Sequence, residues 1–205
     1  LPINEESTLN PNTNYGRKKV EADNVFINYY KKNKFPVSIL KLSLTYGPQM
    51  GLLRQISSDF SWIDRIRKGQ PIIICDNGEA RCQFMHVDDA AIAFKSLLGK
   101  KESFGEVFNL VDKNIYTWRQ YHKTAMSIIG KNVKIIEVSF NELQKLKIPG
   151  FKLCREVFKN DLYFCSKKLN KVLPEFRSQI SLEEGMRGVI NHMDMNGVIE
   201  KSFIQ

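Results

Sequence analysis

The most informative absence from this chain of 205 residues is a glycine-rich loop. Glycine occurs 12 times, and no G-x-x-G-x-x-G pattern lies between an expected strand and an expected helix. Such a loop lets the backbone approach a pyrophosphate and directs helix amides towards it. These residues therefore include no dinucleotide-phosphate loop of that type.

Paired cysteines, long apolar runs and a leader segment are absent too. The four cysteines form no C-x-x-C pair, so the sequence predicts no zinc or other metal site and no thioredoxin-type site. No apolar run approaches the ~18 residues of a membrane span, so we expect no membrane partner. The first residues have neither the basic nor the apolar segment of a signal peptide. We therefore expect free thiols in a reducing, cytoplasmic setting.

The net charge of +9 suits a polyanionic partner such as nucleic acid or a nucleotide. Lysine is spread along the whole chain, however, rather than gathered in one patch. Charge alone therefore does not indicate nucleic acid. With 42% hydrophobic and 11% aromatic residues, the chain can bury a core, which excludes a disordered protein.

Strand and helix patterns alternate, which predicts an α/β fold. Helices are expected over residues 15–33, 52–68, 88–98, 118–129, 141–146, 166–172 and 181–193. Strands are expected over residues 37–45, 71–75, 81–87, 107–111 and 133–138. The Asn77-Gly78 pair predicts a hairpin turn between the strands 71–75 and 81–87.

Several helix starts have recognisable capping residues. Thr117 is an expected N-cap of helix 118–129, which Gly130 closes. Ser181 and Glu184 have the spacing of a capping box. Asp89 is expected to cap the helix that follows it, where free amides and the helix dipole favour a negative side chain.

Tyr15 and Lys19 are the sharpest chemical signal. They stand four residues apart in helix 15–33, so their side chains share one face. An ammonium close to a phenol favours the phenolate, which can exchange a proton with a substrate hydroxyl. The same ammonium can donate hydrogen bonds to a ribose. A Y-x-x-x-K spacing also occurs in ordinary amphipathic helices, so the pair alone leaves both interpretations open.

Further motifs accompany this pair in a specific order, after a loop that contains Pro and Glu. They are Y-G-x-x-K at 15–19, Y-G-P at 46–48, F-M-H-V-D-D at 84–89, G-E-V-F-N at 105–109, T-W at 117–118 and S-L-E-E-G-M-R at 181–187. In this order and spacing, the chain resembles the extended short-chain dehydrogenase/reductase family, also called NAD-dependent epimerase/dehydratase, over nearly its whole length.

The resemblance implies roles for particular residues. Tyr15 would be the general acid/base, and Lys19 would bind the nicotinamide ribose and favour the Tyr15 phenolate. The backbone at Leu42 and Ser43 would face the nicotinamide of NAD or NADP. Residues implied to be structural are His86, Asp89, Asn109 and Trp118.

Two positions depart from the pattern of family members that act on nucleotide sugars. Those members often have Asn three residues after the basic position of the Y-G-P strand, where this chain has Lys41 and then Leu44. They also often have Arg shortly before H-V-D, but Cys82 stands there and Arg81 lies one residue earlier. Because one step along a strand turns a side chain to the other face, Arg81 is a substrate-binding candidate only if it can still reach the site.

The resemblance implies the C-terminal part of a Rossmann-type parallel sheet plus a smaller α/β substrate-binding domain. Residues 1–48 and 86–111 would be Rossmann units, and residues 49–85 and 112–205 would form the substrate domain. In the family, the glycine-rich loop and a catalytic Ser/Thr precede the tyrosine, but only 14 residues precede Tyr15 here. We therefore expect a truncated chain that by itself binds NAD poorly and is inactive.

Three functions follow from the resemblance. The first is part of an NAD(P)-dependent epimerase, dehydratase or reductase that acts on a nucleotide sugar. The second keeps the chemistry but has a non-nucleotide carbonyl substrate, which Leu44 and Cys82 favour. The third is an atypical RNA-binding relative of the same fold, which would not need Tyr15 and Lys19. The resemblance also implies a homodimer formed through the helix that bears Tyr15.

Overall fold

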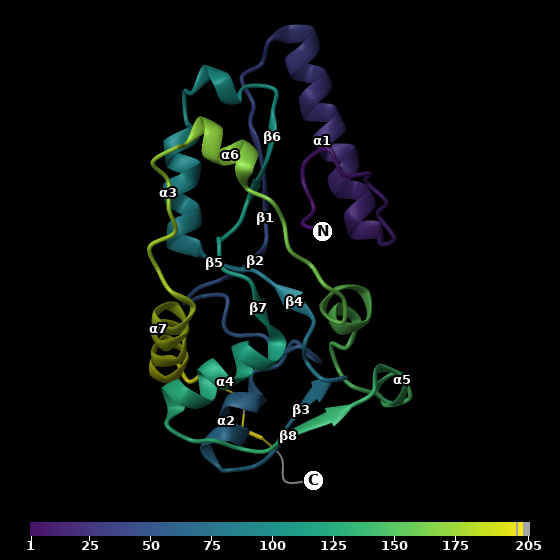
Figure 1. The fold of residues 1–205 in the computed structure, drawn as a ribbon, viewed down its shortest axis with the longest axis vertical. Helices are drawn as coiled ribbons and strands as arrows, with labels where there is room; N and C mark the ends of the chain where they lie inside the picture. Colours follow the sequence, from purple (N-terminus) through teal and green to yellow (C-terminus); the bar gives the residue numbers. More distant parts are fainter. Residues whose placement is uncertain (200, 203–205) are drawn as a thin grey trace.

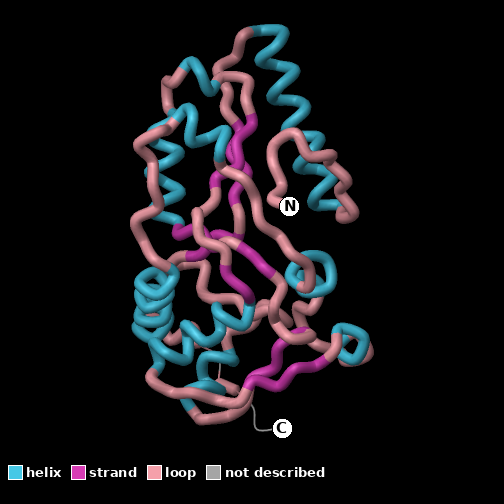
Figure 2. Tube along the Cα trace, viewed as in Figure 1, coloured by secondary structure: helices cyan, strands magenta, loops and turns pink. Residues whose placement is uncertain are grey.

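Apolar segments and capped helices alternate along the chain, and the computed structural model arranges them as a central run of strands flanked by helices (Figures 1 and 2). It describes residues 1–199 and 201–202. The helices are α1 (Asn14–Asn33), α2 (Ser61–Arg67), α3 (Val87–Leu97), α4 (Trp118–Ile129), α5 (Phe140–Leu143), α6 (Lys167–Val172) and α7 (Leu182–Met195), with a 3₁₀ turn η1 (Lys101–Ser103) and a π-helical turn η2 (Cys154–Phe158). The strands are β1 (Ile39–Leu42), β2 (Leu44–Tyr46), β3 (Ile72–Cys75), β4 (Arg81–Cys82), β5 (Phe84–His86), β6 (Val107–Leu110), β7 (Tyr116–Thr117) and β8 (Ile135–Val138).

Strands β1 and β6 form a parallel pair between two helices. Their register aligns Leu40 with Phe108 and Leu42 with Leu110. Figure 1 shows α1 on one side of this pair and α3 on the other. Phe108, Leu110 and Met85 are buried in one apolar cluster with residues of α3 and α6. Parallel strands covered by helices on both faces confirm the predicted α/β class.

The largest core lies at the other end of the molecule, where α2, α4 and α7 meet (Figure 1). Trp62, Trp118, Tyr121 and Met186 are buried there. Strand β3 pairs in parallel with β8, and β4 pairs antiparallel with β7. Within residues 1–199 and 201–202, no helix combines the length and apolarity that a bilayer crossing requires.

The expected single strand over residues 37–45 is two strands. β1 pairs with β6, whereas β2 pairs in parallel with β5, so the chain changes neighbours at Ser43. The alternating leucines at 40, 42 and 44 continue from β1 into β2 without interruption. The sequence pattern therefore does not mark the break, which is defined only by the change of pairing partner.

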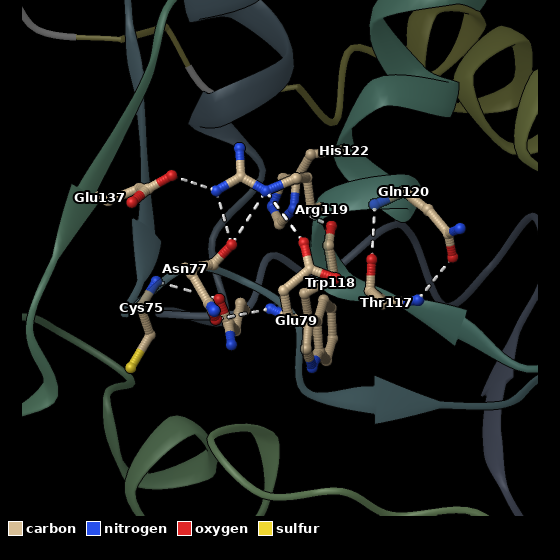
Figure 3. Close-up of polar contacts among 10 residues, drawn as sticks. Cys75, Asn77, Glu79, Thr117, Trp118, Arg119, Gln120, His122 and Glu137 are labelled. Atoms are coloured by element: carbon tan, nitrogen blue, oxygen red, sulfur yellow. Dashed lines mark hydrogen bonds and ion pairs between the residues drawn. The ribbon is translucent and has the colours of Figure 1, made fainter.

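The predicted hairpin at Asn77-Gly78 is wrong, although the turn exists. Gly78 donates its backbone N–H to the Cys75 carbonyl at 3.0 Å and has a φ of 71°. Arg119 of α4 donates to the Asn77 carbonyl at 2.9 Å and also pairs with Glu79 and Glu137 (Figure 3). After the turn, β4 pairs with β7 and β5 pairs with β2, whereas β3 pairs with β8, so the two expected arms of the hairpin do not meet.

The expected helix over residues 52–68 is helical only from Ser61. The preceding residues follow an irregular path in which Leu52, Gln55, Ile56 and Ser57 are buried. Gln55 accepts from the Cys75 amide at 3.0 Å, and the Ser57 hydroxyl donates to the Pro149 carbonyl at 2.6 Å. These long-range side-chain bonds replace the helical bonds that the local apolar spacing had suggested.

The N-cap predictions hold for two helices and fail for one. Thr117 caps α4 in a complete capping box with Gln120. Ser181 caps α7 by accepting from the Glu184 amide at 3.2 Å, but the return bond of the predicted capping box, from the Ser181 amide to the Glu184 side chain, is absent from the described residues. His86, rather than Asp89, caps α3. Asp89 is buried and accepts from two backbone amides beyond α6, at residues 179 and 180. It joins two distant segments instead of ending its own helix.

Candidate active site

Tyr15 and Lys19 lie on one face of the first turns of α1. Thr13 caps this helix and accepts from the Gly16 amide at 2.9 Å. A Cβ at Gly16 would lie 3.1 Å from the Pro11 side chain, so the close loop explains this glycine. The Lys19 Nζ lies 5.4 Å from the centre of the Tyr15 ring, and Tyr15 is 72% exposed. The predicted pair is therefore close together and open to an incoming ligand.

A groove of about 740 Å³ runs between α1 and β1. Tyr15 and Lys19 line its helical wall, and Leu42 and Ser43 line its strand wall. The Lys41 Nζ and an Asp23 carboxylate oxygen lie 3.1 Å apart and join the two walls. The structure thus brings all four predicted catalytic and cofactor-binding residues to one groove. Their roles stay predictions.

The strand wall of the groove is an open sheet edge. β1 pairs with β6 on one side, and within the described residues no strand pairs with its other side. An open edge presents backbone N–H and C=O groups to whatever enters the groove. A second hollow, of about 300 Å³, lies at the end of α3 and also includes Ser38 and Leu40 of this segment in its lining. Ser38 and Leu40 therefore line both hollows.

An aromatic pocket of about 290 Å³ adjoins the groove at Ser43. Its walls include Phe84 stacked on Tyr121 with ring centres 4.6 Å apart, and Trp118 at 4.6 Å from Phe158. All the side chains that line it are uncharged. Aromatic faces without charges suit an uncharged ring or the apolar face of a sugar.

Ser43 has an unsatisfied hydroxyl at this junction. Its Oγ is buried and has no hydrogen-bond partner in the described residues. Ser43 lines both the groove and the aromatic pocket. A buried hydroxyl without a partner is costly, so a ligand that bonds it would gain specificity there.

Arg81 lies apart from both cavities. Its guanidinium bonds Asp161 at 2.5 Å and lies 4.8 Å from the centre of the Tyr163 ring. It is not among the residues that line the groove or the pocket. The neighbouring Cys82 is buried, and burial raises the pKa of its thiol. The structure therefore does not bring the predicted Arg81 to the other candidates.

The sequence did not lead us to predict the aromatic side chains that line the pocket. Trp118 was expected to be structural, and it is buried, but it also lines the pocket. Tyr121 and Phe158 were not identified. The helical spacing of Trp118 and Tyr121 was a visible signal, whereas Phe158 reaches the pocket through a π-helical turn that no local pattern announced. Among the residues that the structure describes, no group of three potential metal ligands occurs.

Comparisons with known proteins give the family and the fold of the chain. A family model described as "NAD dependent epimerase/dehydratase family" matches residues 1–110. The chain is 23% identical over 137 residues to 2'-dehydrokanamycin reductase of Streptomyces kanamyceticus, which covers 67% of this chain and 39% of that protein. It is 31% identical over 108 residues to dTDP-D-glucose 4,6-dehydratase of Mus musculus, which covers 53% of this chain and 29% of that protein.

Solved structures match most of the chain. RMD from Pseudomonas aeruginosa, in complex with NADPH, matches with a TM-score of 0.76 and 17% identity over 96% of this chain and 61% of that chain. UDP-glucose 4-epimerase from Thermotoga maritima, in complex with UDP-glucose, matches with a TM-score of 0.73 and 19% identity over 95% of this chain and 58% of that chain. At these identities the likeness shows the Rossmann-type fold. The chain spans less than two thirds of the length of these relatives.

Proposed function

Because the chain belongs to the NAD dependent epimerase/dehydratase family, we propose that it carries the acid/base pair and the substrate pocket of an NAD(P)-dependent enzyme. The observation that carries the proposal is the shared groove of Tyr15, Lys19, Leu42 and Ser43. The groove meets the aromatic pocket at Ser43, so a cofactor in one and a substrate in the other would be adjacent.

Each groove residue has a definite task in this proposal. Tyr15 exchanges a proton with the substrate hydroxyl, since its side chain lines the groove and is exposed to an incoming ligand. Lys19 donates hydrogen bonds to a ribose. Ser43 supplies a hydroxyl and Leu42 an apolar wall beside a nicotinamide ring. When bound, NAD(P) supplies the hydride chemistry.

The residues present fit only one end of such a cofactor. Hydroxyls of Tyr15 and Ser43 and the ammonium of Lys19 suit a nicotinamide and its ribose. No glycine-rich loop for the pyrophosphate occurs in these 205 residues. We therefore propose that a further part of the enzyme, with that loop, extends the sheet at the open edge of β1.

The division into two units is part of the proposal. Residues 1–48 and 86–111 would belong to the cofactor-binding domain, and residues 49–85 and 112–205 to the substrate domain. Leu169 and Leu173 share the apolar cluster of Phe108, which supports moving α6 to the first unit. The large cluster around Trp118 supports the second unit.

We propose a nucleotide sugar as the leading substrate class, because relatives named as dTDP-D-glucose 4,6-dehydratase and UDP-glucose 4-epimerase match the chain. A non-nucleotide carbonyl compound is the second candidate. The uncharged pocket and the pairing of Arg81 with Asp161 favour it, since a diphosphate needs charge-assisted contacts. The relative named 2'-dehydrokanamycin reductase also supports it.

Tyr15→Phe and Lys19→Met test the proposal in the full polypeptide that includes a cofactor loop. General acid/base catalysis contributes about 10²–10⁴-fold, so we expect Y15F to lower kcat by at least about 100-fold. Tyr29→Phe and Lys18→Met on the same helix are matched controls that lie outside the groove. Equal activity of Y15F and Y29F would overturn the proposal.

Substrate class is tested by calorimetric titration of the same polypeptide. Uridine and thymidine diphosphates are compared with neutral amino sugars, with the cofactor present in both cases. Binding of a nucleoside diphosphate that weakens steeply with salt supports the leading candidate. Binding of the neutral compounds alone supports the second.

A further inference from the structure

Two buried cysteines meet in a small apolar cluster outside the candidate active site. Cys75 ends β3, and Cys154 begins the π-helical turn η2. Cys75 is 1% exposed, Cys154 is 0% exposed, and both are free thiols. They belong to one cluster with Ile56, Leu143 and Phe151. The fold therefore brings into one cluster two thiols that are far apart in the sequence.

Hydrogen bonds of a third residue also connect strand β3 to the turn η2. The buried Gln55 accepts from the Cys75 amide at 3.0 Å and donates to the Phe158 carbonyl at 3.2 Å. One side chain thus bridges the end of β3 to the end of the cysteine-bearing turn. The meeting of the thiols is consequently a fixed feature of the fold.

The two thiols differ in their hydrogen bonding. The Cys75 thiol donates to an Asp76 carboxylate oxygen at 3.5 Å, and Cys154 lies in the same buried cluster. The neighbouring Cys154 thiol, together with burial, raises the pKa of Cys75. The Cys75 thiol in turn lowers the pKa of Cys154, although burial acts in the opposite direction. Cys154 is therefore the better nucleophile of the two.

The turn that carries Cys154 is also a wall of the aromatic pocket. Leu153, Val157 and Phe158 line that pocket, while Cys154 points to the cluster behind it. A covalent bond from Cys154 to β3 would hold this wall in place. Cys82 and Cys165 lie outside the cluster, so they have no equivalent position.

We propose that Cys75 and Cys154 are an oxidisable thiol pair whose disulfide clamps the pocket wall to β3. With hydrogen peroxide, the Cys154 thiolate attacks one oxygen and gives a sulfenic acid and, after proton uptake, one water. The Cys75 thiol then attacks that sulfur, forms the S–S bond and releases a second water. In sum, two thiols and one peroxide give one disulfide and two waters. Because both sulfurs are buried, the reaction proceeds through local opening of the turn.

Peptide mapping of the purified protein after hydrogen peroxide treatment tests the pair. We expect the loss of two hydrogen masses and a cross-linked peptide that contains Cys75 and Cys154. Cys75→Ser and Cys154→Ser should each abolish this product, whereas the control Cys165→Ser should keep it. Because the mapping uses the unmutated protein, the test stands even if a serine variant does not fold. Oxidation confined to Cys165, or cross-links to it, would overturn the proposal.

Hydrogen exchange tests the clamp itself. Closing a long loop with a disulfide should raise the midpoint of thermal unfolding by roughly 5–10 °C. Amides of residues 153–158 should exchange at least several-fold more slowly in the oxidised protein. A Cys75–Cys154 disulfide with unchanged exchange in this turn would contradict a clamp on the pocket wall.

Discussion

Protonation of His122 would place a charge in a buried aromatic core. His122 is 0% exposed and lies between Trp62, Trp118 and Tyr121. Its Nδ1 lies 2.7 Å from the Trp118 carbonyl, and its Nε2 has no hydrogen-bond partner in the described residues. Burial lowers the pKa of His122 to about 4, the charge of Arg54 acts in the same direction, and the bond to Trp118 opposes them.

This shift makes stability depend on pH in a definite direction. The unfolded chain takes up the proton below a pKa of 6.5, whereas the folded chain does so only near a pKa of about 4. The contribution of His122 to the free energy of unfolding therefore falls as the pH falls from about 6.5 to 4, and this contribution levels off below that range. The difference between the two pKa values of His122 corresponds to roughly 3 kcal/mol in the free energy of unfolding. Of this, about 2 kcal/mol is lost by about pH 4.5.

Urea unfolding followed by tryptophan fluorescence measures this loss at about pH 7 and about pH 4.5. His122→Phe keeps an aromatic ring in the core but removes the titrating group, so its stability should depend less steeply on pH. Ser127→Ala, on an exposed position of α4, is the matched control. The reasoning is refuted if H122F and S127A lose the same free energy between the two pH values.

Two further predictions concern the packing of the fold. Asp89→Ala leaves two partly buried backbone amides without the buried carboxylate that they bond, and it should lower the free energy of unfolding by about 2–4 kcal/mol, with Asp89→Asn intermediate; urea titration decides, and a loss below 1 kcal/mol contradicts it. Gly105→Ala places a Cβ 2.1 Å from the Tyr30 ring at a φ of 77°, so it should cost at least about 2 kcal/mol. Gly99→Ala has a similar φ of 76° but open space, so it should cost only the backbone strain of about 1 kcal/mol; equal losses would rule out the clash.

Local signals predicted most of the helices. Thr117 caps the start of α4 and Gly130 caps its end, as the sequence predicts, because both capping signals act within a few residues. Tyr15 and Lys19 share a face for the same local reason. The groove that they line with Leu42 and Ser43 also agrees with the family resemblance.

Long-range pairing was beyond local reasoning. The change of strand partner at Ser43 leaves the alternation of side chains intact, so no residue marks it. Gln55 looks like a helical position but bonds β3 and η2 instead. Arg81 was a substrate candidate because of its place in a motif, whereas Asp161, distant in the sequence, holds its guanidinium. Each of these outcomes depends on a partner that the neighbouring residues do not specify.

A crystal structure of the full polypeptide with NAD(P) and a substrate analogue tests the central proposal most directly. We predict that the nicotinamide ribose lies within hydrogen-bond distance of Tyr15 and Lys19, with the Ser43 hydroxyl bonded to cofactor or substrate. The substrate ring should lie against Phe84 and Trp118. A nicotinamide bound away from the groove, with Tyr15 still exposed to solvent, would contradict the proposal.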